Sequence, residues 1–168
     1  ENVNFAYGEE QILSDVSLSV KKGEILGIHG RSGSGKSTLL KLLMRFYDPK
    51  SGSIKINGET LPNINTCSLR DNMAYITQQT YIFNETIEEN IRLARRDATL
   101  EEIMEAAKKA SIHDFILSLP QGYQTKMTEL GGNLSDGEKQ RIGIARAFLH
   151  NAPIILLEEP ASNLDSLN

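Results

Sequence analysis

A glycine-rich loop with defined flanks constrains this sequence more than any other feature. Residues 30–38 fit the pattern G-x-x-x-x-G-K-[ST], in which the amides of a loop and of the following helix bind an anion. Residues 24–29 precede the loop and predict a short buried strand. Residues 37–46 follow it and predict a helix, with Leu39, Leu40, Leu42, Leu43 and Phe46 at helical spacing. Strand, glycine loop and helix form the setting in which this pattern holds phosphate.

The residue types of the loop explain the chemistry. Glycines allow the backbone to approach phosphate oxygens closely, Lys36 adds a point charge for the outer phosphates, and the Ser37 hydroxyl is a ligand for Mg²⁺. The predicted nucleotide-binding residues of the loop are Gly30, Arg31, Ser32, Gly33, Ser34, Gly35, Lys36, Ser37 and Thr38.

Residues 1–29 alternate between apolar and polar side chains, which predicts half-buried strands. Val3, Phe5 and Tyr7 form one alternating set, and Val16, Leu18 and Val20 form another, with a turn at residues 8–10. Tyr7 has two interpretations: it stacks on a purine ring, or it is an ordinary strand tyrosine. The local sequence alone favours the second.

The middle of the chain contains a hairpin and a second buried strand. Asn57 and Gly58 follow an alternating run and predict a tight hairpin turn. Residues 59–72 are polar and predict irregular structure, whereas residues 73–77 predict a buried strand. Gln78 follows that strand at the end where ligands gather in α/β sheets, so it either contacts Mg²⁺ or the attacking water, or is a polar loop residue.

Residues 86–119 predict three short helices, the last of which Pro120 ends. Ser135 and Glu138 form an S-x-x-E capping box before a strong amphipathic helix. The capping role is sufficient to explain these residues. Alternatively, this helix start, with Gly137 for close approach, offers a second anion site.

Residues 154–157 form a continuous apolar run, as in a parallel strand covered on both faces. Glu158 and Glu159 follow it directly. Carboxylates at the end of a buried strand are costly unless they are paired or bind a metal. Beside a phosphate loop, they favour Mg²⁺ coordination and activation of a water molecule.

Composition limits the partners that this chain can have. The net charge of −4 argues against a broad nucleic-acid-binding surface, so no nucleic acid is expected. The single cysteine, Cys67, allows no disulfide within the chain. No apolar run reaches the ~18 residues that span a bilayer, so a link to a membrane must come through a partner.

Taken in order, these motifs resemble the ATP-binding domain of ABC transporters over essentially the whole chain. Residues 30–38 resemble Walker A, 134–138 the LSGGQ signature, 154–159 Walker B and 162–165 the D-loop, while Tyr7 and Gln78 match the adenine-stacking aromatic and the Q-loop glutamine. Residues 45–49 are similar to R-F-Y-D-P and residues 119–125 to L-P-x-G-Y-D-T, both exporter patterns. Thr125, Glu129 and Gly131 fit the exporter T-x-V-G-E-x-G loop, with Thr128 replacing a glycine.

The resemblance implies a function and a set of roles. It implies an ATPase domain of an exporter, with ATP and Mg²⁺ as cofactors, at the cytoplasmic face of a membrane through a transmembrane partner. Glu159 would orient water, Gln78 would sense the γ-phosphate, and Ser37, Gln78 and Glu158 would hold Mg²⁺. Two such domains would pair head to tail, so that Ser135, Asp136, Gly137 and Glu138 of one face the ATP of the other. The segment around Gln78 and residues 86–119 would dock the transmembrane partner.

The implied fold is α/β: a P-loop NTPase (RecA-like) core with an antiparallel β subdomain and an inserted α-helical subdomain. The whole chain, 1–168, would be one ABC ATPase domain. Residues 1–25 and 50–65 would form the β subdomain, residues 26–49, 66–80 and 141–168 the core, and residues 81–140 the helical signature subdomain. Its parallel sheet would contain the strands that end at His29, Thr77 and Leu157.

Three departures from the family pattern alter these expectations. Glu158 stands where Walker B has aspartate, and the longer side chain is expected to weaken Mg²⁺ binding. Asp136 and Glu138 stand where the signature has glycine and glutamine, and they lower the positive potential of the helix start. The family's switch histidine and next sheet strand lie beyond Asn168, so we expect a fragment that exposes a sheet edge and hydrolyses ATP poorly alone.

Two alternatives remain open. One is a module that binds ATP with weak or no turnover, which these departures favour. The other is a non-transport ABC ATPase that works on DNA or ribosomes. The gap from Gln78 to Leu134 is too short for the long coiled coil of the DNA-repair type.

Overall fold

The computed structural model describes residues 1–158, apart from the side chain of Glu129. Contacts divide the chain into two compact units, Glu1–Arg70 and Asp71–Asn168, each with its own core. The first contains β1 (Val3–Tyr7), β2 (Glu10–Val16), α1 (Lys36–Leu43), β3 (Lys55–Ile56), β4 (Glu59–Thr60) and the 3₁₀ helix η1 (Leu61–Asn63), and α2 (Thr66–Asp71) ends at the boundary. The second contains β5 (Met73–Ile76), α3 (Ile87–Arg92), α4 (Leu100–Lys109), α5 (His113–Ser118), the 3₁₀ helices η2 (Gly122–Gln124) and η3 (Glu129–Gly131), α6 (Asp136–His150) and β6 (Ile154–Leu157).

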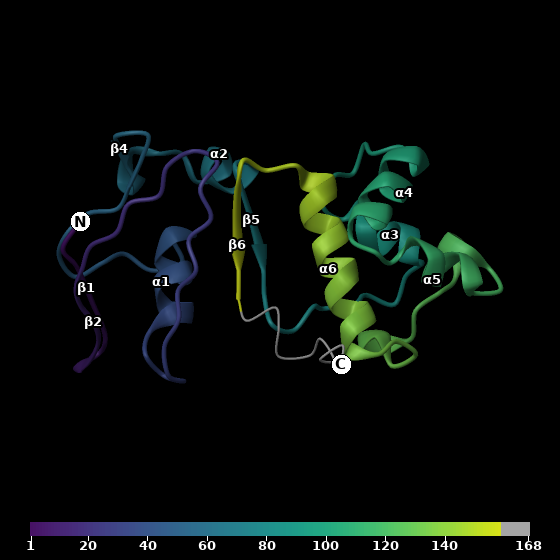
Figure 1. Cartoon of the computed structure of the whole chain (residues 1–168), viewed down its shortest axis with the longest axis horizontal. Helices are drawn as coiled ribbons and strands as arrows, with labels where there is room; N and C mark the ends of the chain where they lie inside the picture. Colours follow the sequence, from purple (N-terminus) through teal and green to yellow (C-terminus); the bar gives the residue numbers. More distant parts are fainter. Residues whose placement is uncertain (159–168) are drawn as a thin grey trace. The chain divides into compact units, whose positions relative to one another are not determined.

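In the first unit, α1 packs on the antiparallel pair of β1 and β2 (Figure 1). The alternation predicted for residues 3–7 is confirmed, since Val3 and Phe5 are buried and Phe5 lies opposite Leu13 in the register. Leu39 and Leu42 of α1 complete this small core. The core therefore joins the helix that follows the glycine loop to the strand pair.

The strand predicted for residues 24–29 is wrong, and β2 ends at Val16, so the predicted continuation through Leu18 and Val20 is wrong as well. Ile25 is 97% exposed. An apolar run forms a strand only where a neighbouring strand supplies hydrogen-bond partners for its backbone. Among residues 1–158, no strand pairs with residues 24–29, so the apolar pattern alone does not produce one.

The helix after the loop is shorter than its apolar pattern predicts. α1 ends at Leu43, and Arg45 takes a left-handed backbone with φ of 55°. The amide of Phe46 then donates to the Lys41 carbonyl at 2.9 Å, as in a Schellman turn. Phe46 consequently leaves the helix face and is 49% exposed, which corrects its assignment to the apolar stripe.

The predicted hairpin is confirmed, because β3 pairs with β4 across Asn57 and Gly58, both with positive φ. The irregular structure predicted for residues 59–72 is wrong in part. β4, η1 and α2 occupy most of this segment, and the buried Leu69 anchors α2. A single apolar anchor in a polar segment carries too weak a periodicity to predict a helix.

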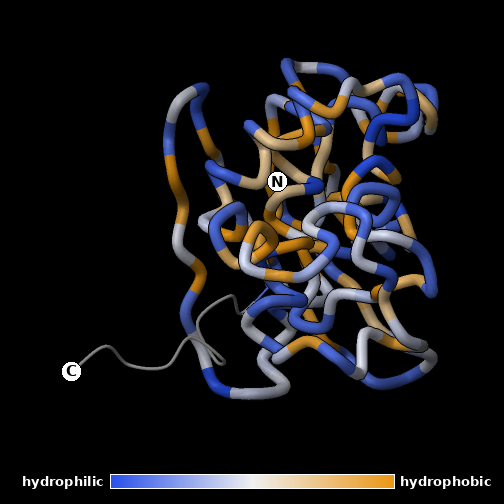
Figure 2. Tube along the Cα trace, turned by 90° about the vertical axis from the view of Figure 1, so that its right-hand side faces the viewer, coloured by the Kyte–Doolittle hydropathy of each residue, from blue (hydrophilic) through white to orange (hydrophobic). Residues whose placement is uncertain are grey.

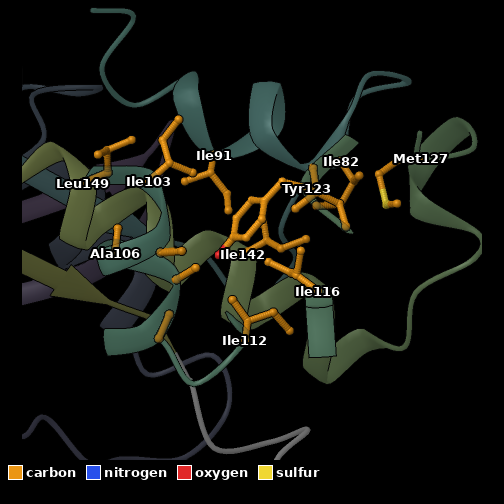
Figure 3. Packing of buried hydrophobic residues seen from close by; sticks show 14 of the residues in the cluster. Ile82, Ile91, Ile103, Ala106, Ile112, Ile116, Tyr123, Met127, Ile142 and Leu149 are labelled. Atoms are coloured by element: carbon orange, nitrogen blue, oxygen red, sulfur yellow. The ribbon is translucent and has the colours of Figure 1, made fainter. Parts of the chain in front are cut away.

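In the second unit, β5 and β6 pair in parallel, and α6 lies between this pair and helices α3, α4 and α5 (Figure 1). The main core forms where α6 meets these helices, and the Tyr123 ring lies among isoleucines in it (Figure 3). The predicted helices of residues 86–119 are confirmed as α3, α4 and α5. Thr86 and Thr99 cap α3 and α4 through their side chains.

The predicted strands at residues 73–77 and 154–157 are confirmed, but the complete burial of the second is wrong. Ala147 of α6 packs against Ala74 and Ile76 of β5. Because α6 lies over β5, Ile155 and Leu157 of β6 stay about half exposed. Within residues 1–158, β5 is the one strand beside β6, so the pair presents open edges.

A buried polar contact joins α3 to α6. Asn90 is completely buried, and its side chain exchanges hydrogen bonds with Phe83, accepting from the amide at 2.9 Å and donating to the carbonyl at 3.0 Å. The Arg146 guanidinium donates to the carbonyl and side-chain oxygens of Asn90 at 2.7 and 2.9 Å, and to the Tyr81 carbonyl at 2.8 Å. Burial lowers the pKa of Arg146 to about 10, which leaves it charged at neutral pH. These two residues therefore fix the loop after β5 to α6.

Within the described residues, no helix is long and apolar enough to cross a bilayer. Hydrophobic and hydrophilic residues alternate at short intervals along the trace (Figure 2).

We expect Asn90→Ala to lower the free energy of unfolding by about 3 kcal/mol or more, since it leaves several buried groups without partners. Urea unfolding followed by circular dichroism measures this change. The control is Asn133→Ala, because Asn133 is exposed and its loss should change stability by about 0.5 kcal/mol or less. Similar losses in both variants would contradict the role of Asn90.

Candidate functional site

The glycine loop of the first unit ends in an uncapped helix start. Gly35 occupies the N-cap of α1 with φ of 89°, and no side chain caps the helix. The first turn also carries no acidic residue. The first amides of a helix have no carbonyl partner within it, so a helix start without a side-chain cap, such as that of α1, suits an anion. The positive end of the helix dipole favours negative charge at this point.

Gly35 also sets how closely the loop approaches β2. A Cβ atom at this position would lie 2.7 Å from Cδ2 of Leu13 and 3.1 Å from Cγ2 of Ile12. A side chain here would have to push aside the buried Leu13 side chain and would crowd the Ile12 carbonyl at 3.3 Å, in addition to the strain of positive φ. The loop is therefore held from behind by the core of the first unit.

Lys36 folds across the loop. Its ammonium group donates to the carbonyl oxygens of Gly30 and Arg31, both at 2.9 Å. Ser37 is partly buried and Thr38 is buried at the start of α1. The structure thus brings together the residues that sequence analysis assigned to phosphate binding in this unit.

Tyr7 ends β1 in the same unit and is 39% exposed. Its ring makes edge contacts with Phe5 and Tyr47, with centroid distances of 4.9 and 5.3 Å. The sequence indicates Tyr7 as a site residue but gives no indication of Tyr47. The contact between the two rings joins β1 to the segment after α1, so no local sequence pattern reveals it.

In the second unit, the parallel register brings Gln78 and Glu158 to the same edge of the β5–β6 pair. Ile76 lies opposite Leu157, so both residues follow the carboxyl ends of adjacent strands. Gln78 is exposed, and the amide of Glu158 continues the ladder by donating to the Ile76 carbonyl at 2.9 Å. Glu159 lies outside the described residues.

Tyr75 contacts the carboxylate of Glu158, a contact that sequence analysis missed. Its hydroxyl donates to Oε2 of Glu158 at 2.7 Å. Burial raises the pKa of Tyr75 well above its usual range, and the neighbouring carboxylate adds to this shift. The phenol therefore stays protonated and remains a hydrogen-bond donor to Glu158.

Each unit, taken by itself, offers oxygen donors of the kind that Mg²⁺ accepts: Ser37 in the first, and Gln78 and Glu158 in the second. A hydroxyl, an amide oxygen and a carboxylate, from Ser37, Gln78 and Glu158, are hard oxygen ligands. Residues 1–158 contain no group of three or more His, Cys, Asp or Glu side chains that would hold a metal alone. Each of these donors is of a type that suits Mg²⁺, which proteins usually bind through one or two carboxylates together with substrate phosphates and water.

The capping box at the start of α6 is confirmed. The Ser135 hydroxyl accepts from the Glu138 amide at 3.3 Å, and Oε2 of Glu138 accepts from the Ser135 amide at 2.7 Å. Asp136 is exposed and lies 3.6 Å from the Lys139 ammonium. The start of α6 therefore carries two carboxylates of its own: Glu138 binds the Ser135 amide, and Asp136 lies near the Lys139 ammonium.

A groove of about 520 Å³ lies in the second unit, between β5 and the C-terminal half of α6. The exposed rings of Tyr81 and Phe83 pack edge to face at its lip, with centroids 4.7 Å apart. The walls come from β5, the loop after it, the end of α3 and one face of α6, through Met73–Thr77, Gln79–Tyr81, Phe83, Leu93, Ala94, Gly143, Arg146, Ala147 and His150.

Comparisons with known proteins agree with this organisation. A family profile described as "ABC transporter" matches residues 13–162. A probable ABC transporter ATP-binding/permease protein of Haemophilus influenzae is 99% identical over 168 residues, which are 100% of this chain and 30% of that protein. A putative multidrug export ATP-binding/permease protein of Bacillus subtilis is 50% identical over 167 residues, 98% of this chain and 29% of that protein.

The solved structure of a bacterial Atm1-family ABC exporter with ATP bound superposes with a TM-score of 0.95 at 44% identity, covering 99% of this chain and 29% of that one. This chain thus spans less than a third of the length of the relatives it matches. The fold is that of the P-loop NTPases. Since the family profile covers most of the sequence, the chain belongs to the ABC transporter family.

Proposed function

We propose that this chain is the nucleotide-binding domain of an ABC exporter, which binds and hydrolyses ATP and so powers transport across a membrane. The observation that carries the proposal is the uncapped start of α1 behind the glycine loop, with Lys36 placed across it. The exporter assignment draws on the relatives, whose names describe ATP-binding/permease proteins and multidrug export.

The residue roles in this proposal are those that the family resemblance implies. The loop amides and Lys36 bind the phosphates, Tyr7 stacks on the base, and Gln78 responds to the γ-phosphate. Glu158 and Ser37 hold Mg²⁺, which supplies charge neutralisation at the phosphate oxygens when bound. Glu159 orients the attacking water.

Two partners complete this function. A second copy or a homologous domain pairs head to tail, so that the signature residues 135–138 of one face the nucleotide of the other. A transmembrane partner places an apolar cytoplasmic loop in the groove lined by Tyr81, Phe83 and Leu93, which keeps the domain at the cytoplasmic face of the membrane. The exposed aromatic lip and the fixed position of the loop after β5 support this docking site.

We also infer the subdomain boundaries expected from the sequence. Residues 1–25 and 50–65 contain β1 to β4 and suit an antiparallel β subdomain, whereas residues 81–140 contain α3 to α5 and suit a helical subdomain. Residues 26–49, 66–80 and 141–168 remain for the core.

A second candidate is a module that binds ATP with weak turnover. The Asp136 and Glu138 carboxylates favour this second candidate, because they place negative charge at the start of α6, where the phosphates of the partner domain's nucleotide would bind. Measuring ATP binding together with phosphate release distinguishes the two candidates.

The test of ATP binding is Lys36→Met, measured by isothermal titration calorimetry with ATP. We expect affinity to fall about tenfold or more, because charge-assisted hydrogen bonds to phosphate are lost. Lys41→Met is the control, since Lys41 lies in the last turn of the same helix. Equal affinity in the unsubstituted chain and in Lys36→Met would contradict the assignment of the loop.

Glu158→Asp should strengthen Mg²⁺ binding in the presence of a non-hydrolysable ATP analogue, because Mg²⁺ requires near-ideal octahedral geometry and the longer side chain fits it poorly. Mn²⁺ titration followed by electron paramagnetic resonance measures metal affinity directly. Tyr75→Phe is measured alongside, because shortening Glu158 also removes the Tyr75 hydrogen bond. Unchanged metal affinity and turnover in Glu158→Asp would refute the expectation.

Asp136→Gly should strengthen ATP-dependent dimerisation a few-fold at low salt, since each charge near a helix start contributes about 0.3–1 kcal/mol. Analytical ultracentrifugation with ATP measures it. Asp136→Asn removes the charge without adding a glycine and should give a similar gain, and both gains should shrink at high salt. A gain in Asp136→Gly alone would indicate backbone flexibility instead of charge.

A further inference from the structure

Tyr47 is an exposed aromatic residue that the proposed function leaves without a role. Its ring lies edge to face with that of Tyr7, at a centroid distance of 5.3 Å and an interplanar angle of 85°. Phe5 contacts both rings, at 4.9 Å from Tyr7 and 5.6 Å from Tyr47. Tyr7 is 39% and Tyr47 44% exposed. Two edge contacts restrict the plane of the Tyr7 ring, which would otherwise rotate at the surface.

Two backbone features place Tyr47 beside β1. The left-handed turn at Arg45 reverses the chain directly after α1. The following segment then pairs with β1, because the Asn4 carbonyl accepts from the Lys50 amide at 2.8 Å and the Asn4 amide donates to the Ser51 carbonyl at 3.0 Å. Tyr47 is therefore fixed at both ends of its segment, and its contact with Tyr7 does not depend on side-chain packing alone.

Phe5 links the aromatic cluster of Phe5, Tyr7 and Tyr47 to the core that lies behind the glycine loop. Phe5 lies opposite Leu13 in the β1–β2 register, and Leu13 is the residue that a Cβ at Gly35 would strike. Phe5 and Leu13 also belong to the cluster that buries one face of α1. The orientation of the Tyr7 ring is thus set against the same residues that hold the phosphate loop.

We propose that Tyr47 is a positioning residue for the base of the nucleotide: it holds the Tyr7 ring in one orientation so that a purine stacks on it. This inference rests on the proposed binding of ATP at the loop. A ring that is already oriented loses no conformational entropy when the base binds. Purines offer a larger face than pyrimidines, so a fixed ring favours ATP over CTP.

The neighbouring residue supplies a matched control. Phe46 is 49% exposed and directly precedes Tyr47, and none of the ring contacts among residues 1–158 involves it. Phe46→Leu therefore removes an exposed ring of similar size without touching the cluster. Tyr47→Phe keeps the ring and removes only the hydroxyl.

The experiment measures the dissociation constants of ATP, CTP and inorganic triphosphate for the whole chain by calorimetry. We expect Tyr47→Leu to weaken ATP binding about five- to tenfold, to reduce the preference for ATP over CTP and to leave triphosphate binding unchanged. Tyr47→Phe should restore the unsubstituted values, and Phe46→Leu should match them. In a Tyr7→Leu background, Tyr47→Leu should add no further loss.

Two results would overturn the role of Tyr47 and leave the proposed function standing. One is an equal loss of triphosphate affinity, which would mean that the substitution disturbs the whole unit. The other is a full loss of ATP affinity that persists in the Tyr7→Leu background. If the unsubstituted chain bound neither ATP nor triphosphate, the proposed function would fail, and this inference with it.

Discussion

Backbone amides at the start of a helix need partners from outside the helix, and the helices of this chain meet that need in different ways. α3, α4 and α6 meet it with side chains at their N-caps, through Thr86, Thr99 and Ser135, whereas α5 has no side-chain cap but carries Asp114 in its first turn. α1 begins after Gly35, which has no side chain, and its first turn holds no acidic residue, so this helix start suits an anion. Such a loop has to be held from behind, and the close contact of Gly35 with Leu13 does this. The core of the first unit is thus also the support of the phosphate loop.

Features that depend on a few neighbouring residues could be predicted from the sequence. The capping box of Ser135 and Glu138, the Asn57–Gly58 hairpin and the loop with its helix all follow from short spacings, and the structure contains them. The strand at residues 24–29 failed for the opposite reason. Its formation requires a neighbouring strand, and apolar content says nothing of whether one is present. The half-exposed β6 reflects the same limit, since burial depends on what packs over a strand.

The contacts that orient the site residues were not predictable, because they join distant parts of the chain. Tyr75 and Glu158 are separated by 83 positions and meet only through the parallel register. Asn90 and Arg146 are 56 positions apart, and each looks like an ordinary surface residue in its own helix pattern. Polar residues at such positions are expected to be exposed. Their burial becomes favourable only when both partners arrive together, which local spacing cannot show.

The acids that depart from the family pattern are all engaged within the described structure. Glu138 turns back onto the Ser135 amide, Asp136 lies near Lys139, and Glu158 accepts from Tyr75. A carboxylate with a hydrogen-bond donor or a basic neighbour presents less uncompensated charge than a bare one. In the function proposed above, a phosphate at α6 would compete with Glu138 for the Ser135 amide, and Mg²⁺ at Glu158 would meet a carboxylate oxygen already hydrogen-bonded to a phenol. The departures would then weaken ligand binding by an amount that depends on how tightly each of these contacts within the protein is held.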